Sequence, residues 1–348
     1  AGGGRVVSGL SGTEREAAAE EEEPSAPAPA PAPAPAAPSE YLSNTMFQAL
    51  TPTNARAFTG SAGDSFIGYT AADSTAQDAL IDAGKGAGNS ATFDMSAGGN
   101  NTFVAGDRAA SSSGSIAYTG GSGDDSLTFG TFLAHENGTA TFDMSLGGNN
   151  TLVAGTAAAS SPGMDGAGGA ASFSGSISYE GGSGDDSLTF GNFLVFSGGN
   201  ATFNMSAGGN NTFVAEDYAA SGGSISSTGG SGVDSLTFGD DLAAFSGTAT
   251  FDLGSDSAVD TVTFEGTVAA SSGNVSISNF DPSDGDTIVL QLFSDTADVT
   301  LSASSSSDTL VSAFGVAFVI SSVVTGSLGL TTNSSGHVVI AAASSIIV

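Results

Sequence analysis

Aspartates in three glycine-rich loops are the residues whose type and spacing could do chemistry in this sequence. The segment "GGSGDDSLTFG" occupies residues 120–130 and returns unchanged at 181–191, and "GGSGVDSLTFG" follows at 229–239. Two neighbouring carboxylates can act as acid and base in hydrolysis, or supply the oxygen ligands that a hard cation prefers. The same glycines and aspartates are also typical of tight turns in a structural repeat. The loops are therefore a candidate catalytic pair, metal site or turn.

The loops belong to a longer repeat. The segment "ATFDMSAGGNNTFVAG" (91–106) recurs at 140–155 and 201–216, and a diverged copy starts at 249. Because "GNNTFVAG" aligns with "GDDSLTFG", asparagine loops alternate with aspartate loops. With steps of 24 to 26 residues and one step of 36, the aligned positions are Asn100, Asp124, Asn149, Asp185, Asn210, Asp234, Asp260 and Asp286. We interpret Asp64 and Asp308 as weaker members, and residues 161–172 as the loop that lengthens one step.

A repeat of about 24 residues suits one turn of a β-solenoid that carries two short strands and two turns. Side chains alternate between the two faces of a strand, so the apolar residues of each repeat share one face. Stacked turns would bury two sets of apolar side chains: Phe93, Phe142, Phe203 and Phe251 in one, and Leu127 and Phe129 alternating with Phe103 and Ala105 in the other. We therefore predict an all-β fold, a parallel β-helix or β-roll-like solenoid of about ten turns.

Four segments are expected along the chain. Residues 1–38 hold an acidic block and an Ala-Pro tract, which predict a disordered tail or linker because alternating proline favours an extended chain without a core. Residues 39–56 are expected to form a short N-terminal cap helix. The solenoid spans 57–291. Residues 292–348 are β-rich and apolar, and we expect a C-terminal cap or an assembly or secretion segment.

The charge of the chain excludes some classes of partner. Its 348 residues carry 36 acidic and five basic side chains, a formal net charge of −31, and no cysteine. Such a surface repels nucleic acid, so we expect no nucleic-acid partner. No run of about 18 apolar residues occurs, so we expect no transmembrane segment. The lack of cysteine fits neither a disulfide scaffold nor a thiol enzyme.

The loop "GGSGDDSLTFG" resembles the glycine- and aspartate-rich nonapeptide of RTX proteins, the haemolysin-type calcium-binding repeat family. In that family, loop carboxylates and carbonyls hold Ca²⁺ between successive turns. The resemblance covers roughly residues 57–291, although only three loops match closely, and "ISNFDPSDGDTIVLQ" (277–291) resembles the stretch that follows such repeats in secreted bacterial proteins. Carried over by position, together with the neighbouring Asp124 and Asp185, it implies Ca²⁺ at Gly121, Gly123, Asp125, Gly182, Gly184, Asp186, Gly230, Gly232 and Asp234.

The spacing departs from the family pattern. RTX nonapeptides follow one another in tandem, whereas the aspartate loops here are 49 or 61 residues apart with an asparagine loop between them. An asparagine amide can donate a hydrogen bond to a neighbouring carboxylate, so a metal-free ladder of Asp and Asn side chains is the alternative to calcium. Both interpretations stay open from the sequence.

These features favour a non-catalytic extracellular or cell-surface protein with a structural or adhesive role, as in a surface layer, sheath, filament or matrix. Its partners would be further copies of itself, matrix or polysaccharide. One alternative is a polysaccharide-active β-helix enzyme, but the bases and histidines that could serve it (Lys85, Arg108, His135, His337) are scattered, and we expect His135 to be a solvated turn residue. Another is an ice- or mineral-binding solenoid that presents the threonines of "TAT" at 139–141 and 248–250.

Overall fold

The computed structural model describes residues 56–59, 65–67, 90–105, 109–110, 113–156, 175–268, 273–314 and 316–343. All of them lie in one compact unit, residues 38–348. The described chain is all-β apart from two short 3-10 helices, η2 (Thr296–Asp298) and η3 (Thr325–Ser327). No helix in it has the length and the apolar character that crossing a membrane requires. The expected tail, residues 39–55 of the expected cap helix, Asp64 and the 161–172 loop lie outside the described residues, while Arg56 begins strand β1.

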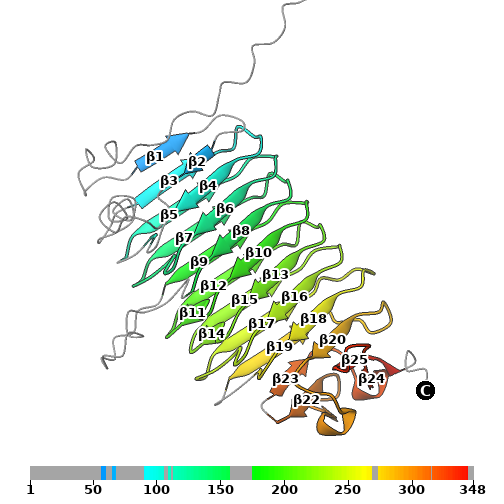
Figure 1. Cartoon of the computed structure of the whole chain (residues 1–348). Helices are drawn as coiled ribbons and strands as arrows, with labels where there is room; N and C mark the ends of the chain where they lie inside the picture. Colours follow the sequence, from blue (N-terminus) through cyan, green and yellow to red (C-terminus); the bar gives the residue numbers. More distant parts are fainter. Residues whose placement is uncertain are drawn as a thin grey trace, which may run out of the picture. The chain divides into compact units, whose positions relative to one another are not determined.

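Two long sheets build the unit, and the chain moves from one to the other at each step (Figure 1). Sheet A takes, in spatial order, β1 (Arg56–Thr59), β3 (Ser90–Asp94), β5 (Ser115–Thr119), β7 (Thr139–Asp143), β9 (Ser176–Glu180), β12 (Asn200–Asn204), β15 (Ser224–Thr228), β17 (Thr248–Asp252) and β19 (Asn274–Ser278). Sheet B takes β2 (Ser65–Ile67), β4 (Thr102–Ala105), β6 (Ser126–Phe129), β8 (Thr151–Ala154), β10 (Ser187–Phe190), β13 (Thr212–Ala215), β16 (Ser235–Phe238), β18 (Thr261–Phe264) and β20 (Thr287–Leu290).

Neighbouring strands in both series are parallel and in register. One strand of each sheet therefore makes one turn of a parallel β-solenoid, which confirms the predicted fold class. The turns are slightly fewer than the ten that we expected, because Asp308 does not start a further parallel turn. It lies in the hairpin between two antiparallel strands.

The stack ends in antiparallel strands. Sheet A continues through β23 (Val316–Ile320), β22 (Thr309–Ala313) and β21 (Thr300–Ala303), and sheet B through β25 (Val338–Ala342) and β24 (Leu328–Thr332). The hairpin strands β22 and β23 pair antiparallel, as do β24 and β25. The regular coil therefore stops after β20.

The core is the space between the two sheets. On the sheet A side, one row of side chains in register consists of Phe93, Tyr118, Phe142, Tyr179, Phe203, Ser227, Phe251 and Ile277, and all eight are buried. The predicted phenylalanine row is thus confirmed in alternate turns. The sequence analysis did not name the intervening strands of sheet A, because "SIAYT", "SISYE" and "SISST" do not repeat the "ATF" pattern, although each carries a buried isoleucine.

On the sheet B side, large and small side chains alternate as predicted. Phe103 pairs with Leu127, and Ala105 pairs with Phe129, in adjacent turns. Phe129 therefore lies between Ala105 and Ala154 of its two neighbouring turns, which lets these layers interlock at the density of a protein interior, whereas Phe238 pairs with Phe264 further along the stack.

A third, short side closes several of the described turns after the sheet B strand. Two of these segments pair as β11 (Val195–Phe196) and β14 (Ala220–Ser221). His135 lies at the position equivalent to Phe196 and Ser221. It is only 2% exposed, with its ring 4.9 Å from that of Phe132. The expectation that His135 is a solvated turn residue is therefore wrong, because this corner folds inward to cover the core.

We expect Phe203→Ala to lower the free energy of unfolding by about 3–5 kcal/mol, the usual cost of a large cavity in a packed core. Phe203 is fully buried, and its ring lies 5.0 Å from Phe190 and 4.9 Å from Phe213. Denaturant unfolding followed by circular dichroism measures the change. Thr202→Ala, an exposed position on the same strand, should change little; a similar loss in both variants would contradict the assigned strand faces.

Candidate functional site: two side-chain ladders at the loop corner

The three predicted acidic loops lie at one corner of the solenoid, where each turn passes from sheet A to sheet B. Residues 120–125, for example, join β5 to β6 and stack on residues 95–101 of the preceding turn. A Cβ atom at Gly121 would lie 2.4 Å from the Cα of Gly98, and one at Gly123 would lie 2.5 Å from the carbonyl oxygen of Gly99. No side chain fits there.

The other glycines of the predicted calcium set have the same contacts. A Cβ atom at any of them would come within 3 Å of backbone in the preceding turn: Gly182, Gly184, Gly230 and Gly232. These glycines are therefore explained by the close approach of two backbones at the strand spacing, whether or not an ion is bound.

An inner ladder of side chains runs through this corner inside the stack. Its members are at most 2% exposed: Asn101, Asp125, Asn150, Asp186, Asn211, Asp234, Asp260 and Asp286. The backbone N–H of each of the first seven donates to a side-chain oxygen of the member one turn later, as Asn101 N does to Asp125 Oδ1 at 2.9 Å and Asp125 N does to Asn150 Oδ1 at 3.2 Å. The ladder therefore satisfies buried N–H groups that no strand accepts.

The asparagines of the inner ladder also hold the carboxylates. The amide Nδ2 of Asn101 donates to Asp125 Oδ1 at 2.8 Å, and Asn211 donates to Asp234 Oδ1 at 3.0 Å in the same way. The second oxygen of Asp125 accepts from Gly121 N at 3.0 Å. Alternation of Asn and Asp thus lets each buried carboxylate receive an amide donor from the adjacent turn.

An outer ladder follows one residue earlier in each loop, with its polar members exposed: Asn100, Asp124, Asn149, Asp185 and Asn210. Here the hydrogen bonds run the other way along the stack. Asn149 N donates to Asp124 Oδ1 of the preceding turn at 2.8 Å, and Asn210 N donates to Asp185 Oδ1 at 2.7 Å. The two ladders therefore tie each loop to both of its neighbours.

The predicted series of aligned positions was wrong from its sixth member. Val233, not Asp234, continues the outer ladder, since its N–H donates to Asn210 Oδ1. Asp234 belongs to the inner ladder, 23 residues after Asn211. Following the acidic residue type through the repeats shifted the alignment by one position, whereas pairing of Thr212 with Ser235 sets the actual register. Asp260 and Asp286 likewise lie in the inner ladder.

The side chains of adjacent aspartates in one loop face different environments. Asp124 is exposed, while Asp125 is 1% exposed and already accepts three N–H groups. Asp185 and Asp186 divide in the same way. Within the described part of the chain, no three acidic or histidine side chains gather closely enough to hold a metal ion. Calcium at these loops stays a prediction.

The turns that hold the buried carboxylates carry no lysine or arginine of their own, since none occurs in the sequence after Arg108. Burial raises the pKa of Asp186 to about 6, while N–H donors from Asn150 oppose the rise. Burial, followed by the charge of Asp186, raises the pKa of Tyr179 well above its usual range. Three of the aspartate turns carry a hydroxyl residue, Tyr118, Tyr179 or Ser227, where the asparagine turns carry phenylalanine, whereas the turns of Asp260 and Asp286 carry Phe251 and Ile277. The sequence analysis missed this link between a buried hydroxyl and a buried aspartate.

The Asn–Asp alternation breaks at the C-terminal end of the inner ladder. Asp234 N donates to Asp260 Oδ1 and Asp260 N donates to Asp286 Oδ1, both at 2.8 Å, so three buried aspartates follow one another. Burial raises the pKa of Asp260 to about 7, and the charges of Asp286 and Asp234 add to that rise. Asp260 stands at the ladder position that asparagine holds in the alternating turns, but a carboxylate brings no amide donor to its neighbours.

This arrangement predicts greater stability at pH 5 than at pH 8. A carboxyl whose folded pKa is about 7 and whose ordinary pKa is 3.8 stabilises the fold fully below the lower value. That contribution is lost as the pH rises through the higher value. We expect Asp260→Asn to flatten this dependence and to add about 1–2 kcal/mol at pH 8. Thermal unfolding at fixed ionic strength and several pH values measures it.

Asp143→Asn is the control, because it removes one charge from an exposed turn and leaves the inner ladder intact. It should keep the pH dependence of the wild-type chain. Equal flattening in both variants would assign the effect to net charge and not to the buried aspartates.

Comparison of the chain with models of protein families, with curated proteins and with solved structures found no match. The likeness to RTX repeats therefore rests on the residues of the three loops.

Proposed function

We propose that this chain is a non-catalytic structural or adhesive repeat protein that acts outside the cell. A single observation carries the proposal: the acidic residues have the same hydrogen-bonding part in turn after turn, from Asn101 to Asp286. A catalytic centre needs a particular set of side chains at one place, whereas these carboxylates accept hydrogen bonds that join successive turns. They support a scaffold, as in a surface layer, sheath, filament or matrix.

The charge distribution supports the same proposal. A net charge of −31 keeps individual molecules apart at low salt, and screening or divalent cations would let them approach. The partners that suit this surface are further copies of the chain or neutral matrix polysaccharide. Nucleic acid does not suit it.

The proposal predicts no hydrolysis or elimination on a panel of neutral and acidic polysaccharides, measured as reducing ends or unsaturated products. The pair Asp124 and Asp125 does not converge on one substrate atom, because one carboxylate faces solvent and the other faces the core. Activity that disappears in Asp124→Ala, in a variant that keeps its thermal midpoint, would establish the enzyme alternative and overturn the scaffold.

The ladder also predicts how calcium acts on stability. Since N–H groups already occupy the inner carboxylates, Ca²⁺ and Mg²⁺ at equal concentration should raise the thermal midpoint equally by screening charge. A chelator should then leave the midpoint of the metal-free chain unchanged. A rise specific to Ca²⁺ that is lost on Asp124→Asn together with Asp185→Asn would instead establish the RTX-like site, because a ligand stabilises only the state that binds it.

Binding to an ordered surface is the second candidate, and the outer face of sheet B favours it. Every outward side chain on β4, β6, β8, β10, β13, β16, β18 and β20 is Ser, Thr or Val. Hydroxyl and methyl groups thus repeat at the strand spacing of about 4.8 Å without a charge, as a neutral lattice such as ice requires. The predicted "TAT" threonines do face outward, but on sheet A, beside Asp143 and Asp252.

A further inference from the structure

The outer face of sheet B consists of two rows of small, uncharged side chains that run along the stack. The strand register places Ser or Thr in the first row: Thr102, Ser126, Thr151, Ser187, Thr212, Ser235, Thr261 and Thr287. It places Val or Thr in the second row: Val104, Thr128, Val153, Thr189, Val214, Thr237, Thr263 and Val289. All of these side chains are at least partly exposed.

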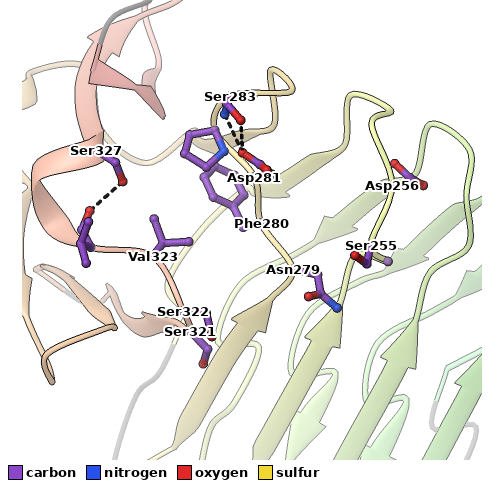
Figure 2. Close-up of a pocket in the computed structure, with 13 residues that line it drawn as sticks. Ser255, Asp256, Asn279, Phe280, Asp281, Ser283, Ser321, Ser322, Val323 and Ser327 are labelled. Carbon is purple, nitrogen blue, oxygen red and sulfur yellow. Dashed lines mark hydrogen bonds between the residues drawn. The ribbon is translucent and has the colours of Figure 1, made fainter.

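Carboxylates lie on the other sides of the stack. Sheet A carries Asp143 and Asp252 on its outer face. At the loop corner, Asp256 and Asp281 line a pocket of about 460 Å³ where the last parallel turns meet the antiparallel strands (Figure 2). The corner that follows sheet B carries Asp240. Because the chain has a net charge of −31, two copies repel each other least where a face without carboxylates meets its like, and the rows of sheet B form such a face.

The two edges of this face carry its nearest charges. We number the turns 1 to 8 by their sheet B strands, from β4 to β20. Beside the first row lies the outer ladder, whose positions in turns 1 to 8 are Asn100, Asp124, Asn149, Asp185, Asn210, Val233, Val259 and Gly285. Beside the second row lie, in turns 2 to 8, Gly130, Gly155, Gly191, Glu216, Gly239, Glu265 and Gln291. One edge therefore has carboxylates in turns 2 and 4, and the other has them in turns 5 and 7.

We propose that two copies of this chain pack through their sheet B faces with their stacks antiparallel. A two-fold axis parallel to the strands, between β10 and β13, brings each row onto the same row of the other copy and lets all eight turns overlap. No carboxylate then meets another, since the facing pairs at the edges are Asp124 with Val259, Asp185 with Asn210, Glu216 with Gly191, and Glu265 with Gly130.

One of these edge pairs is complementary. The amide Nδ2 of Asn210 donates one N–H to Asp185 Oδ1 of its own copy at 3.1 Å. An amide carries two N–H groups, so the second can donate to Asp185 of the other copy. The two-fold axis makes this contact twice.

Other arrangements bring like charges together. Moving the axis onto β10 would set Asp185 against Asp185 of the other copy, and moving it onto β13 would set Glu216 against Glu216. An axis along the stack would keep these carboxylates apart, but it would align like ends of the two chains. Arg56 begins β1 and no lysine or arginine follows Arg108, so antiparallel stacks place the end that holds bases beside turns that have none.

The size of the face predicts a reversible contact. Eight strands about 4.8 Å apart and four residues long cover about 500 Å², so the pair buries about 1,000 Å² in total, the lower end of the range for specific interfaces. We expect a dimer that forms with rising concentration and with salt, because salt screens the charges outside the interface. The inference rests on the structural role proposed above, for which it names how further copies join.

Sedimentation velocity of the full chain at several concentrations tests the interface. Between about 0.01 M and about 0.15 M salt the Debye length falls from about 30 Å to about 8 Å, and we expect the dimer at the higher salt. Thr128→Glu places a carboxylate in the second row and should raise the dissociation constant at least about tenfold. Thr141→Glu is the matched control, because Thr141 is exposed on the outer face of sheet A, and it should leave the dimer intact.

Equal weakening by both variants, or a chain that stays monomeric at both salt concentrations, would overturn the interface. The structural role would survive that result, because copies can join through another face; its own test is activity on polysaccharides. A monomer that shapes growing ice crystals, with the effect lost in Thr128→Glu, would assign the face to ice and overturn the dimer.

Distances between spin labels test the antiparallel register. The chain has no cysteine, so Ala97→Cys, Leu146→Cys and Ala207→Cys each provide a single labelling site. The three residues are exposed at equivalent places of the loop corner, in turns 1, 3 and 5, and lie outside the two rows. Along the stack, a label should lie about 34, about 14 and about 5 Å from the same label on the other copy. Electron spin resonance should therefore give distances that fall from Ala97 to Ala207, whereas equal distances would indicate parallel stacks and overturn the proposal.

Discussion

The solenoid depends on how its corner backbone is satisfied. Strands pair through their own N–H and C=O groups, but residues at a corner leave the sheet while the next turn still lies only about 4.8 Å away. In the loops from Asn101 onward, side-chain oxygens one turn away accept those corner N–H groups. Glycines allow the approach, since any Cβ at Gly121 or Gly123 would strike the neighbouring turn. Glycine therefore permits the close approach of the turns, and the Asx side chains accept the N–H groups that this approach leaves without a strand partner.

This arrangement of Asx side chains places carboxylates in the interior of a stack whose chain has no lysine or arginine after Arg108. Alternation with asparagine resolves the conflict, because each amide gives the adjacent carboxylate a donor at about 3 Å. Where three aspartates meet at Asp234, Asp260 and Asp286, burial raises all three pKa values. The inner ladder is joined by hydrogen bonds from Asn101 to Asp286, and in its alternating part each carboxylate receives an amide donor.

The repeated acidic loops and the pocket at the end of the repeats differ in how they are built. The residue types of the acidic loops suggested a catalytic or metal-binding site. The copies of these loops, however, have equivalent hydrogen-bond partners in successive turns. The pocket lined by residues 254–256, 279–283 and 321–327 lies where the parallel coil gives way to antiparallel strands. Its lining combines two diverged copies of the repeated corner with a segment from outside the repeats.

The sequence by itself determined the period, the two strands of each turn and the apolar rows, because side chains alternate locally with a period of two. The glycine–aspartate turn was also evident from its residues. Only the tertiary structure decided that Asp125 faces the core while Asp124 faces solvent, and that Val233 and not Asp234 continues the outer ladder. The burial of His135 and the presence of the pocket were likewise evident only from the tertiary structure. These outcomes depend on pairing between residues 23 to 36 positions apart, and a shift of one residue exchanges the inside and outside of a strand.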